Sequence, residues 1–141
     1  MIYLIGSLRN PFIPAIANAL EDKLEIKVFA DWFAAGPRTD DHWREYAKAR
    51  GQKYTEALLE PHAVDVFQFD QIHLDMSDAA VLVLPAGKSG HLELGYMIGR
   101  GKPGWILLDG EPERWDIMYQ FATGVATDTG ELSDMIGKVL K

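Results

Sequence analysis

The sequence predicts one α/β domain, residues 1–141, in which helices cover both faces of a five-stranded parallel sheet. Strand-like segments alternate with segments of helical period along all 141 residues, which is typical of such three-layer sandwiches. Two of the strand-like segments, Ile2–Ser7 and Ala79–Ala86, begin as continuous apolar runs, as expected for strands covered on both faces. Because crossovers between parallel strands are right-handed, few topologies remain, and we expect the flavodoxin-like (Rossmann-like) strand order 2-1-3-4-5.

Each further element follows from a local pattern. Apolar residues recur at helical spacing from Phe12 to Lys23, and an alternating, β-branched second strand is expected at Glu25–Asp31. Pro61 divides the next helical region, so we expect one helix over about His42–Leu59 and another that runs to about Met76. The remaining patterns predict a helix from His91, a strand at Gly104–Gly110, a helix at Pro112–Ala122, a short strand at Gly124–Asp128 and a closing helix at Gly130–Lys141.

Composition excludes several classes of function. The chain has no cysteine, which excludes disulfides, zinc–thiolate sites and a thiol nucleophile, and its four histidines lack the spacing of metal ligands. The formal charge is −7 and no cluster of lysine and arginine is present, so no nucleic-acid polymer is expected as a partner. No apolar run approaches the roughly 20 residues that span a bilayer, and Met1 begins no signal-peptide pattern. We therefore expect a cytoplasmic protein without a membrane partner.

The predicted topology also places a ligand site. Ligands of such sheets bind beyond the carboxyl ends of the strands where the strand order reverses, here between the first and third strands. The two loops at that point, Gly6–Asn10 and Ala86–Glu93, contain glycine, serine and cations, which suits an anionic or polar ligand held by backbone amides. A phospho-accepting receiver domain is excluded, because Gly6–Ser7 and Pro85–Ala86 stand where its acidic residues are needed. The loop after the first strand is also a poor flavin-phosphate loop.

Glu93 is the first candidate catalytic residue. In a structural role it would be an acid at a helix start, although Gly90, three residues earlier, has no side chain to complete a capping box. Gly95 and Gly99 each cost about 1 kcal/mol relative to alanine in a helix, so we expect their face to approach the sheet or another helix closely. A helix held in this way would fix Glu93 over the crevice, and both interpretations stay open.

Asp70 is the second candidate. It shares one helix face with Ala63, Phe67 and Leu74, so it occupies a position where an apolar residue would pack. Burial raises a carboxyl pKa, and a carboxyl that keeps a proton near neutrality can act as a general acid. The alternative is a partly buried aspartate that caps or pairs with a neighbour such as His73. One ionised and one protonated carboxyl can together cleave a glycosidic bond, because one attacks the anomeric carbon while the other protonates the leaving group.

Three segments, "IYLIGSLRN", "FDQIHLDMSDAAVLVL" and "SGHLELGY", resemble in this order the nucleoside 2-deoxyribosyltransferase superfamily, which includes the 2′-deoxynucleoside 5′-phosphate N-hydrolases. The likeness covers about Ile2–Asp109. It implies that Glu93 is the nucleophile, that Asp70 is the acid or orients the base, and that Tyr3 buttresses the glutamate and the sugar. In phosphate-using members the corresponding turns hold the 5′-phosphate, which implies binding roles for Gly6, Ser7, Arg9, Ser89 and Gly90.

The sequence departs from the family pattern in three places. Members commonly carry two glycines before the glutamate, whereas this chain has S-G-H-L-E, so that His91 either contacts the sugar or phosphate or faces solvent. The segment Asp31–Trp43 has no clear counterpart, and its Trp32, Phe33 and Trp43 either stack on a nucleobase or belong to the core. The C-terminal "GKVLK" lacks the polar residues with which neighbouring subunits of the nucleoside-exchanging enzymes bind a 5′-hydroxyl.

The resemblance therefore implies cleavage of the N-glycosidic bond of a 2′-deoxynucleoside 5′-monophosphate, or of a nucleoside, through a covalent Glu93 ester. Water is the favoured acceptor, and no metal or redox cofactor is required. A homo-oligomer is expected, because neighbouring subunits complete the sites of this family and the face with Gly95 and Gly99 could equally be an interface. Two alternatives stay open. One is base exchange between nucleosides by a 2-deoxyribosyltransferase, and the other is a nucleotide-binding or sensing module without turnover.

Overall fold

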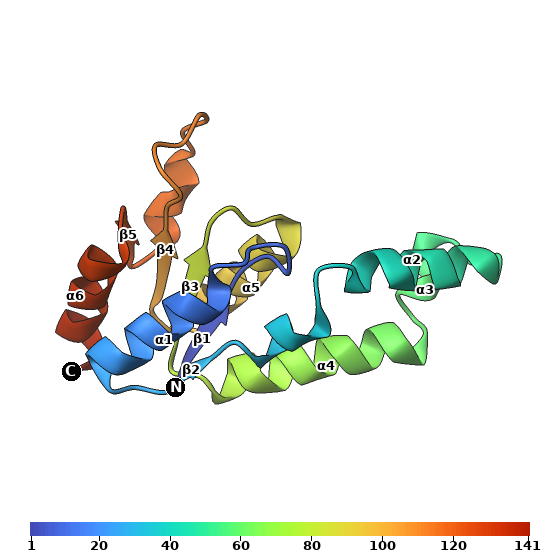
Figure 1. Ribbon diagram of the computed structural model, residues 1–141, viewed down its shortest axis with the longest axis horizontal. Coiled ribbons are helices and arrows are strands. Elements are labelled where there is room, and N and C mark those ends of the chain that lie inside the picture. Colours follow the sequence, from blue (N-terminus) through green and yellow to red (C-terminus); the bar gives the residue numbers. More distant parts are fainter.

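The computed structural model describes residues 1–141 and contains one five-stranded sheet in which every strand is parallel (Figure 1). Its order is β2-β1-β3-β4-β5, so the predicted three-layer α/β class and strand order are confirmed. In register, Ile2 pairs with Val28 on one side and with Ala79 on the other. The strands are β1 (Ile2–Ile5), β2 (Val28–Phe29), β3 (Ala79–Val83), β4 (Gly104–Leu107) and β5 (Gly124–Ala126).

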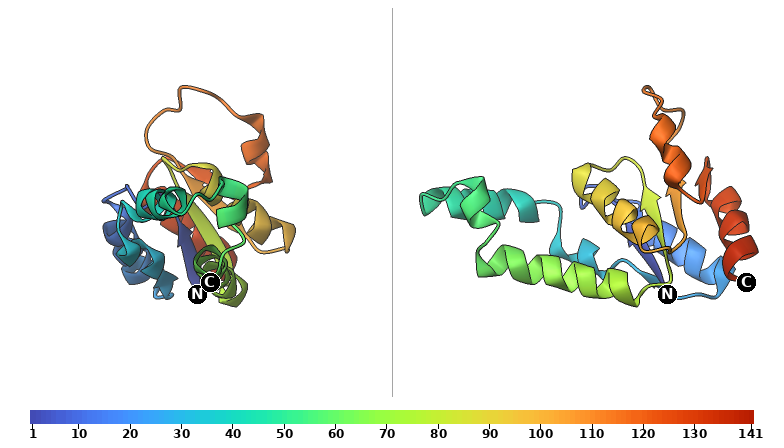
Figure 2. Two further views of the ribbon diagram at one scale, coloured as in Figure 1. Left: turned by 90° about the vertical axis from the view of Figure 1, so that its right-hand side faces the viewer. Right: turned by 180° about the vertical axis from the view of Figure 1, so that it is seen from behind.

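Helices cover the two faces of the sheet (Figures 1 and 2). The α-helices are α1 (Ile13–Leu24), α2 (Thr39–Ala49), α3 (Tyr54–Ala57), α4 (Pro61–Met76), α5 (Lys88–Gly99) and α6 (Thr129–Leu140). Two 3-10 turns, η1 (Asp31–Ala35) and η2 (Ile117–Phe121), complete the chain. No helix combines the length and the apolar character needed to cross a membrane.

The sheet separates two hydrophobic clusters. Ile2 and Leu4 of β1 point into the cluster that contains the buried residues of α1 and α6, whereas Tyr3 and Ile5 point into the cluster with α4 and α5. All residues of β1, β3 and β4 are buried, which explains their continuous apolar runs. Because side chains alternate along a strand, the only polar side chain of β1, that of Tyr3, lies on the face covered by α4 and α5.

Several predicted boundaries are wrong, for local reasons. The second strand is only two residues long, because Glu25 ends α1 in the left-handed conformation with a φ of 56° and cannot begin a strand. The helix expected from His91 begins at Lys88. The helix expected at Pro112–Ala122 is reduced to η2, whose start is fixed by Asp116 as its side chain accepts a hydrogen bond from the backbone of Met118.

The region predicted as one helix over His42–Leu59 forms two, α2 and α3, and the chain turns between them at Gly51, whose φ is 72°. The sequence predicts an inner stripe of Trp43, Tyr46, Ala47, Tyr54 and Leu58 for this region, and that prediction is also mostly wrong. Ala47 is buried, Trp43 is half-buried, but Tyr46, Tyr54 and Leu58 are exposed. This region therefore does not pack on the sheet as a covering helix would.

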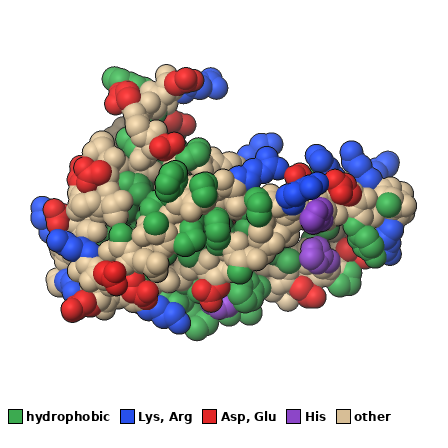
Figure 3. All heavy atoms as spheres, viewed as in Figure 1, with side chains coloured by type: hydrophobic (Ala, Val, Ile, Leu, Met, Phe, Trp, Pro, Cys, Tyr) green, Lys and Arg blue, Asp and Glu red, His purple; other side chains and the backbone are tan.

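Instead, α2, α3 and the amino-terminal half of α4 project from the sheet as an arm, residues 39–69 (Figures 1 and 2). Cationic side chains gather on the arm over α2 (Figure 3), where residues 38–53 contain five lysines and arginines, so the prediction that no such cluster is present is wrong. The predicted inner face of α4 is buried only near its carboxyl end, at Leu74, while Phe67 on the same face is 63% exposed. The helix is thus longer than the part of the sheet that could cover it.

Candidate active site

A cavity of about 730 Å³ lies at the carboxyl end of β1, bordered by η1, α4 and the start of α5. This is the point at which the strand order reverses, where the topology predicted a ligand site. The cavity brings together eight of the nine residues that the sequence nominated: Tyr3, Gly6, Ser7, Arg9, Asp70, Ser89, Gly90 and Glu93. The ninth, His91, does not line it.

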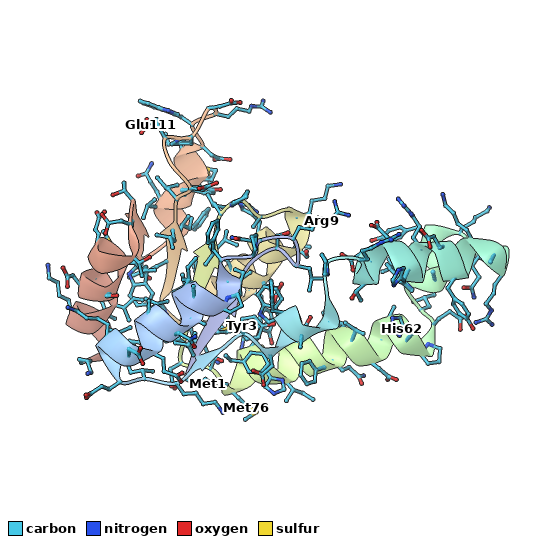
Figure 4. The ribbon with its side chains drawn as sticks, viewed as in Figure 1. Met1, Tyr3, Arg9, His62, Met76 and Glu111 are labelled. Carbon is cyan, nitrogen blue, oxygen red and sulfur yellow. The ribbon has the colours of Figure 1, made fainter.

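Three polar side chains, those of Tyr3, Asp70 and Glu93, come from three different elements and form the polar centre of the cavity. Tyr3 comes from β1 and is 1% exposed, Asp70 comes from the middle of α4, and Glu93 comes from the second turn of α5. The hydroxyl of Tyr3 interacts with both carboxyl groups. Figure 4 shows Tyr3 within the body of the protein and Arg9 on the loop beyond it. Residues far apart in the sequence therefore form one constellation at the inner end of the cavity.

The position of Glu93 excludes its structural interpretation. Since α5 begins at Lys88, Glu93 lies beyond the first turn, where an acid would cap free amides, and that turn contains no acidic residue. Glu93 is instead turned into the protein, against Tyr3 and Asp70. Its burial has no role in starting the helix.

The predicted close approach of α5 is made by a different glycine. A Cβ atom added at Gly90 would lie 3.0 Å from Leu82 Cδ1 and 3.2 Å from Ile5 Cγ2, so this residue lets the helix start rest on the sheet. At Gly95 and Gly99 an added Cβ meets nothing within 4 Å, and both glycines are exposed, so the expectation for that face is wrong. Gly90 thereby sets the height of Glu93 above β1 and β3.

Burial controls the ionisation of this centre. Removal from water and the nearby charge of Asp70 raise the pKa of Glu93 to about 7, against an opposing effect of the Tyr3 hydroxyl. Burial also raises the pKa of Asp70, while His73 and the Tyr3 hydroxyl lower it. Burial and both carboxylates raise the pKa of Tyr3, which therefore stays protonated at neutral pH. The raised pKa of Asp70 agrees with the prediction, but the larger change falls on Glu93.

The proposed partner of Asp70 has other contacts. His73 Nδ1 lies 2.8 Å from the carbonyl oxygen of Phe69, and its ring stacks on Phe29 with centroids 4.2 Å apart. Its influence on Asp70 is electrostatic, without a hydrogen bond between the two side chains. Asp70 is therefore free to face the cavity.

The opposite end of the cavity suits an anion. The Oγ of Ser7 accepts a hydrogen bond from the backbone N–H of Arg9 at 3.1 Å, and this tight turn carries the guanidinium to the rim. Arg9 Nη2 lies 3.1 Å from Asp41 Oδ2 of α2, and the Arg9 side chain is 69% exposed. The start of α5, at Ser89 and Gly90, adds backbone amides that have no acceptor within the helix.

His91 is turned away from the cavity. Its Nδ1 lies 2.8 Å from the carbonyl oxygen of Gly87, and its Nε2 lies 2.8 Å from the hydroxyl of Tyr119 in η2. Because a carbonyl only accepts, Nδ1 carries the proton and Nε2 accepts from Tyr119. The prediction that His91 binds substrate is not supported by this geometry. The side chain instead ties η2 to the loop before α5.

The sequence raised Trp32 as a residue that either stacks on a base or belongs to the core, but it indicated no other residue of the outer wall of the cavity. Trp32 lines this wall, packs against both hydrophobic clusters, and donates a hydrogen bond from Nε1 to the carbonyl oxygen of Leu4 at 2.8 Å. The topology could have indicated that this segment lines the cavity, because the loop after the second strand lies beside the loop after the first strand. The wall residues not nominated are Leu8, Asp31, Ala35, Pro37, Thr39, Asp40, Asp65, Val66, Phe69 and Gly87.

The other two aromatic residues of this segment lie elsewhere. Phe33 packs on the core, and Trp43 packs edge-on against Tyr54 with ring centroids 6.2 Å apart. Of the three aromatic side chains considered for stacking on a base, only Trp32 lines the cavity. Nowhere in the chain do three or more histidine, aspartate or glutamate side chains form a group that could hold a metal ion.

Comparison of the chain with protein-family models and with characterised proteins finds no match. Function is therefore inferred from the residues and the geometry of the cavity.

Proposed function

We propose that the protein cleaves the N-glycosidic bond of a 2′-deoxynucleoside 5′-monophosphate through a covalent ester on Glu93, with water as the final acceptor. The observation that carries this proposal is the pair of half-buried carboxyl groups, Glu93 and Asp70, that lie beside the Tyr3 hydroxyl in one cavity. Two carboxyls in different environments are the usual equipment for breaking a glycosidic bond. The cavity of about 730 Å³ is large enough for a mononucleotide.

In the first step the Glu93 carboxylate attacks C1′ of the sugar, and the bond from C1′ to the base nitrogen breaks. Asp70 gives its proton to the departing base, which leaves more readily when protonated. In the reactive form Asp70 carries the proton and Glu93 is ionised, and the Tyr3 hydroxyl favours this form because it lowers the pKa of Glu93. In the second step Asp70, now ionised, accepts a proton from water, which attacks C1′ and releases sugar phosphate and Glu93.

The anion-binding end of the cavity supports a phosphorylated substrate. A phosphate between the Ser7 turn and the start of α5 would meet backbone amides and the positive end of the helix. Arg9 can reach it by exchanging its exposed contact with Asp41 for a bidentate contact with phosphate oxygens. Binding at this end fixes the sugar with C1′ toward the carboxyl pair. This positions the glycosidic bond for attack.

The test is incubation with each nucleoside and each 5′-monophosphate, with free base and sugar phosphate measured by chromatography. A 2-fluoro sugar substrate should leave a stable ester on Glu93, seen as added mass on the intact protein. Glu93→Ala should abolish turnover, whereas Glu45→Ala, the same change at an exposed glutamate of α2, should not. Near-wild-type turnover by Glu93→Ala would contradict the mechanism.

Two other results would replace the proposal. Formation of an exchanged nucleoside after addition of a second free base would indicate a transferase. Calorimetric binding of monophosphates without any release of base would indicate a binding or sensing module. The same set of substrates serves all of these assays, so one series of measurements distinguishes a hydrolase, a transferase and a binding module.

A further inference from the structure

A second cavity, of about 520 Å³, lies on the other side of the loop Gly6–Asn10 from the candidate active site. It is found at the carboxyl ends of β3 and β4, on the face of the sheet that α1 and α6 cover. Figure 3, viewed onto α1, shows apolar side chains between the start of this helix and the chain after β4. The volume suits a small molecule, and the reaction proposed above makes no use of this cavity.

The second cavity contains a buried amide group that the protein leaves without a partner. Asn10 is 8% exposed, and its Oδ1 accepts a hydrogen bond from the backbone N–H of Phe12 at 3.0 Å. The other two buried polar side chains, Ser77 and Ser133, each donate to a backbone carbonyl oxygen, but Asn10 Nδ2 donates to no atom of the chain. No unpaired side-chain nitrogen or oxygen is sealed inside the protein, so Asn10 Nδ2 reaches the cavity that Asn10 lines.

The rim of the second cavity carries an aromatic ring that neither caps a helix nor packs in the core. Phe12 stands at the N-cap of α1, where polar residues are preferred, and its side chain makes no capping hydrogen bond. It belongs to neither hydrophobic cluster and is 68% exposed. Together with the half-buried Leu84 and Leu108, Phe12 gives the cavity an apolar wall against which a ring could pack.

Two further polar side chains border the second cavity. Asp109 follows β4, and Thr129 is the first residue of α6. An amide N–H only donates and a carboxylate only accepts. A ligand that satisfies this lining therefore offers an acceptor to Asn10, an N–H donor to Asp109 and a flat apolar surface to Phe12. Nucleobases combine these three features.

We propose that the second cavity is a second ligand site, which takes a nucleobase, either free or as part of a nucleotide. A carbonyl oxygen or ring nitrogen of the base accepts from Asn10 Nδ2, and a base N–H donates to Asp109. A purely apolar ligand would leave the amide and the carboxylate unpaired, at a cost in free energy. An inorganic anion would leave the apolar wall uncovered and would face the charge of Asp109.

The two cavities are linked by the loop between them, because Ser7 and Arg9 line both. A nucleotide with its base in the second cavity can direct its phosphate to the same guanidinium that the proposed reaction assigns to the substrate. Monophosphates in the two cavities would then compete for Arg9. This competition rests on the function proposed above, whereas the second site rests only on its own lining.

Nuclear magnetic resonance tests the second site directly, because a chain of 15.8 kDa gives resolved spectra. The isotope-labelled full chain is titrated with adenine, cytosine, hypoxanthine and uracil. We expect the side-chain amide resonances of Asn10 and the methyl resonances of Leu84 and Leu108 to shift with at least one base. Toluene and inorganic phosphate, which each match only part of the lining, should shift the Asn10 amide far less. No shift at Asn10 with any base, or equal shifts with toluene or phosphate, would overturn the proposal.

Two pairs of variants test the residues that form the second site. Asn10→Asp keeps an oxygen that accepts from Phe12 but removes the donor, so the affinity for the base should fall roughly tenfold. Asn18→Asp, the same change at an exposed position of α1 outside the cavity, should bind as the wild type does. Ala15→Trp should fill the cavity from the exposed Ala15 and abolish binding, whereas Asn18→Trp should not. Equal losses within both pairs would overturn the site.

Activity separates the second site from the proposed reaction. If both hold, base release should slow at high monophosphate concentration, and Ala15→Trp should remove this slowing while Asn18→Trp keeps it. Shifts at Asn10 in a protein that cleaves no nucleotide would retain the second site and reject the reaction. Turnover that stays the same when the second cavity is filled would reject the competition for Arg9.

Discussion

The raised pKa of Glu93 has a consequence for stability that can be measured without knowing the substrate. Its pKa is about 7 in the folded protein, against an ordinary value of 4.5. The folded state therefore keeps the Glu93 proton to higher pH than the unfolded chain does, and stability is lost as pH rises from 4.5 towards 7. The full difference corresponds to about 3 kcal/mol. A glutamine side chain cannot ionise, so the stability of Glu93→Gln should not fall in this way as the pH rises.

Thermal or urea unfolding at a series of pH values measures the effect. Relative to the wild type, Glu93→Gln should gain about 2.5 kcal/mol between pH 5 and pH 8, or roughly 5–10 °C in Tm. Any packing difference of glutamine adds equally at every pH and does not alter this slope. Glu45→Gln, at an exposed position in α2, is the control and should run parallel to the wild type. A constant difference between Glu93→Gln and the wild type would refute the burial argument for Glu93.

Three further outcomes are expected. Asp70→Asn should slow release of poor leaving groups most and of activated ones least, because a good leaving group needs no proton; equal losses across a substrate panel would indicate structural damage. Arg9→Ala should reduce the kcat/KM preference for monophosphates over nucleosides by roughly one to two powers of ten, from a charge-assisted hydrogen bond worth about 1.5–3 kcal/mol. Asp41→Ala, which frees Arg9 and also removes an exposed contact with Arg44, should keep that preference. Tyr119→Phe removes the hydrogen bond to His91, so the free energy of unfolding should fall by about 1 kcal/mol and amide exchange in η2 should become faster. Unchanged amide exchange in η2 would contradict the role of this hydrogen bond in holding η2 in place.

Much of the fold was predictable because the apolar runs of the central strands agree with the burial of these strands on both faces. Continuous apolar runs such as Ala79–Val83 are buried on both faces, and the parallel order follows from the alternation with helices. Tyr3, Asp70 and Glu93 line one cavity, which agrees with the shared site that the family resemblance implied. The sequence spacing of Asp70 correctly placed it on the inner face of α4, because helical period does not depend on what covers the helix.

What could not be predicted depends on contacts between distant segments. The pattern that put Phe67 on an inner face could not reveal that the sheet ends before this residue, so that nothing of the same chain covers it. The direction of His91 was open for a similar reason. It is decided by Tyr119, which follows 28 residues later in a segment whose helical pattern was itself misleading. Glycine spacing on α5 likewise gave no indication that Gly90 is the residue resting on the sheet.

The attachment of η1 has a consequence for how this scaffold could change over evolutionary time. None of its residues is fully buried, and the hydrogen bond from Trp32 to Leu4 joins it to β1. Mutations between Asp31 and Asp40 would reshape the mouth of the cavity without disturbing α5, the helix that carries Glu93. New specificities are therefore accessible to drift or to a designed library that randomises this segment and holds Trp32 and Phe33 constant.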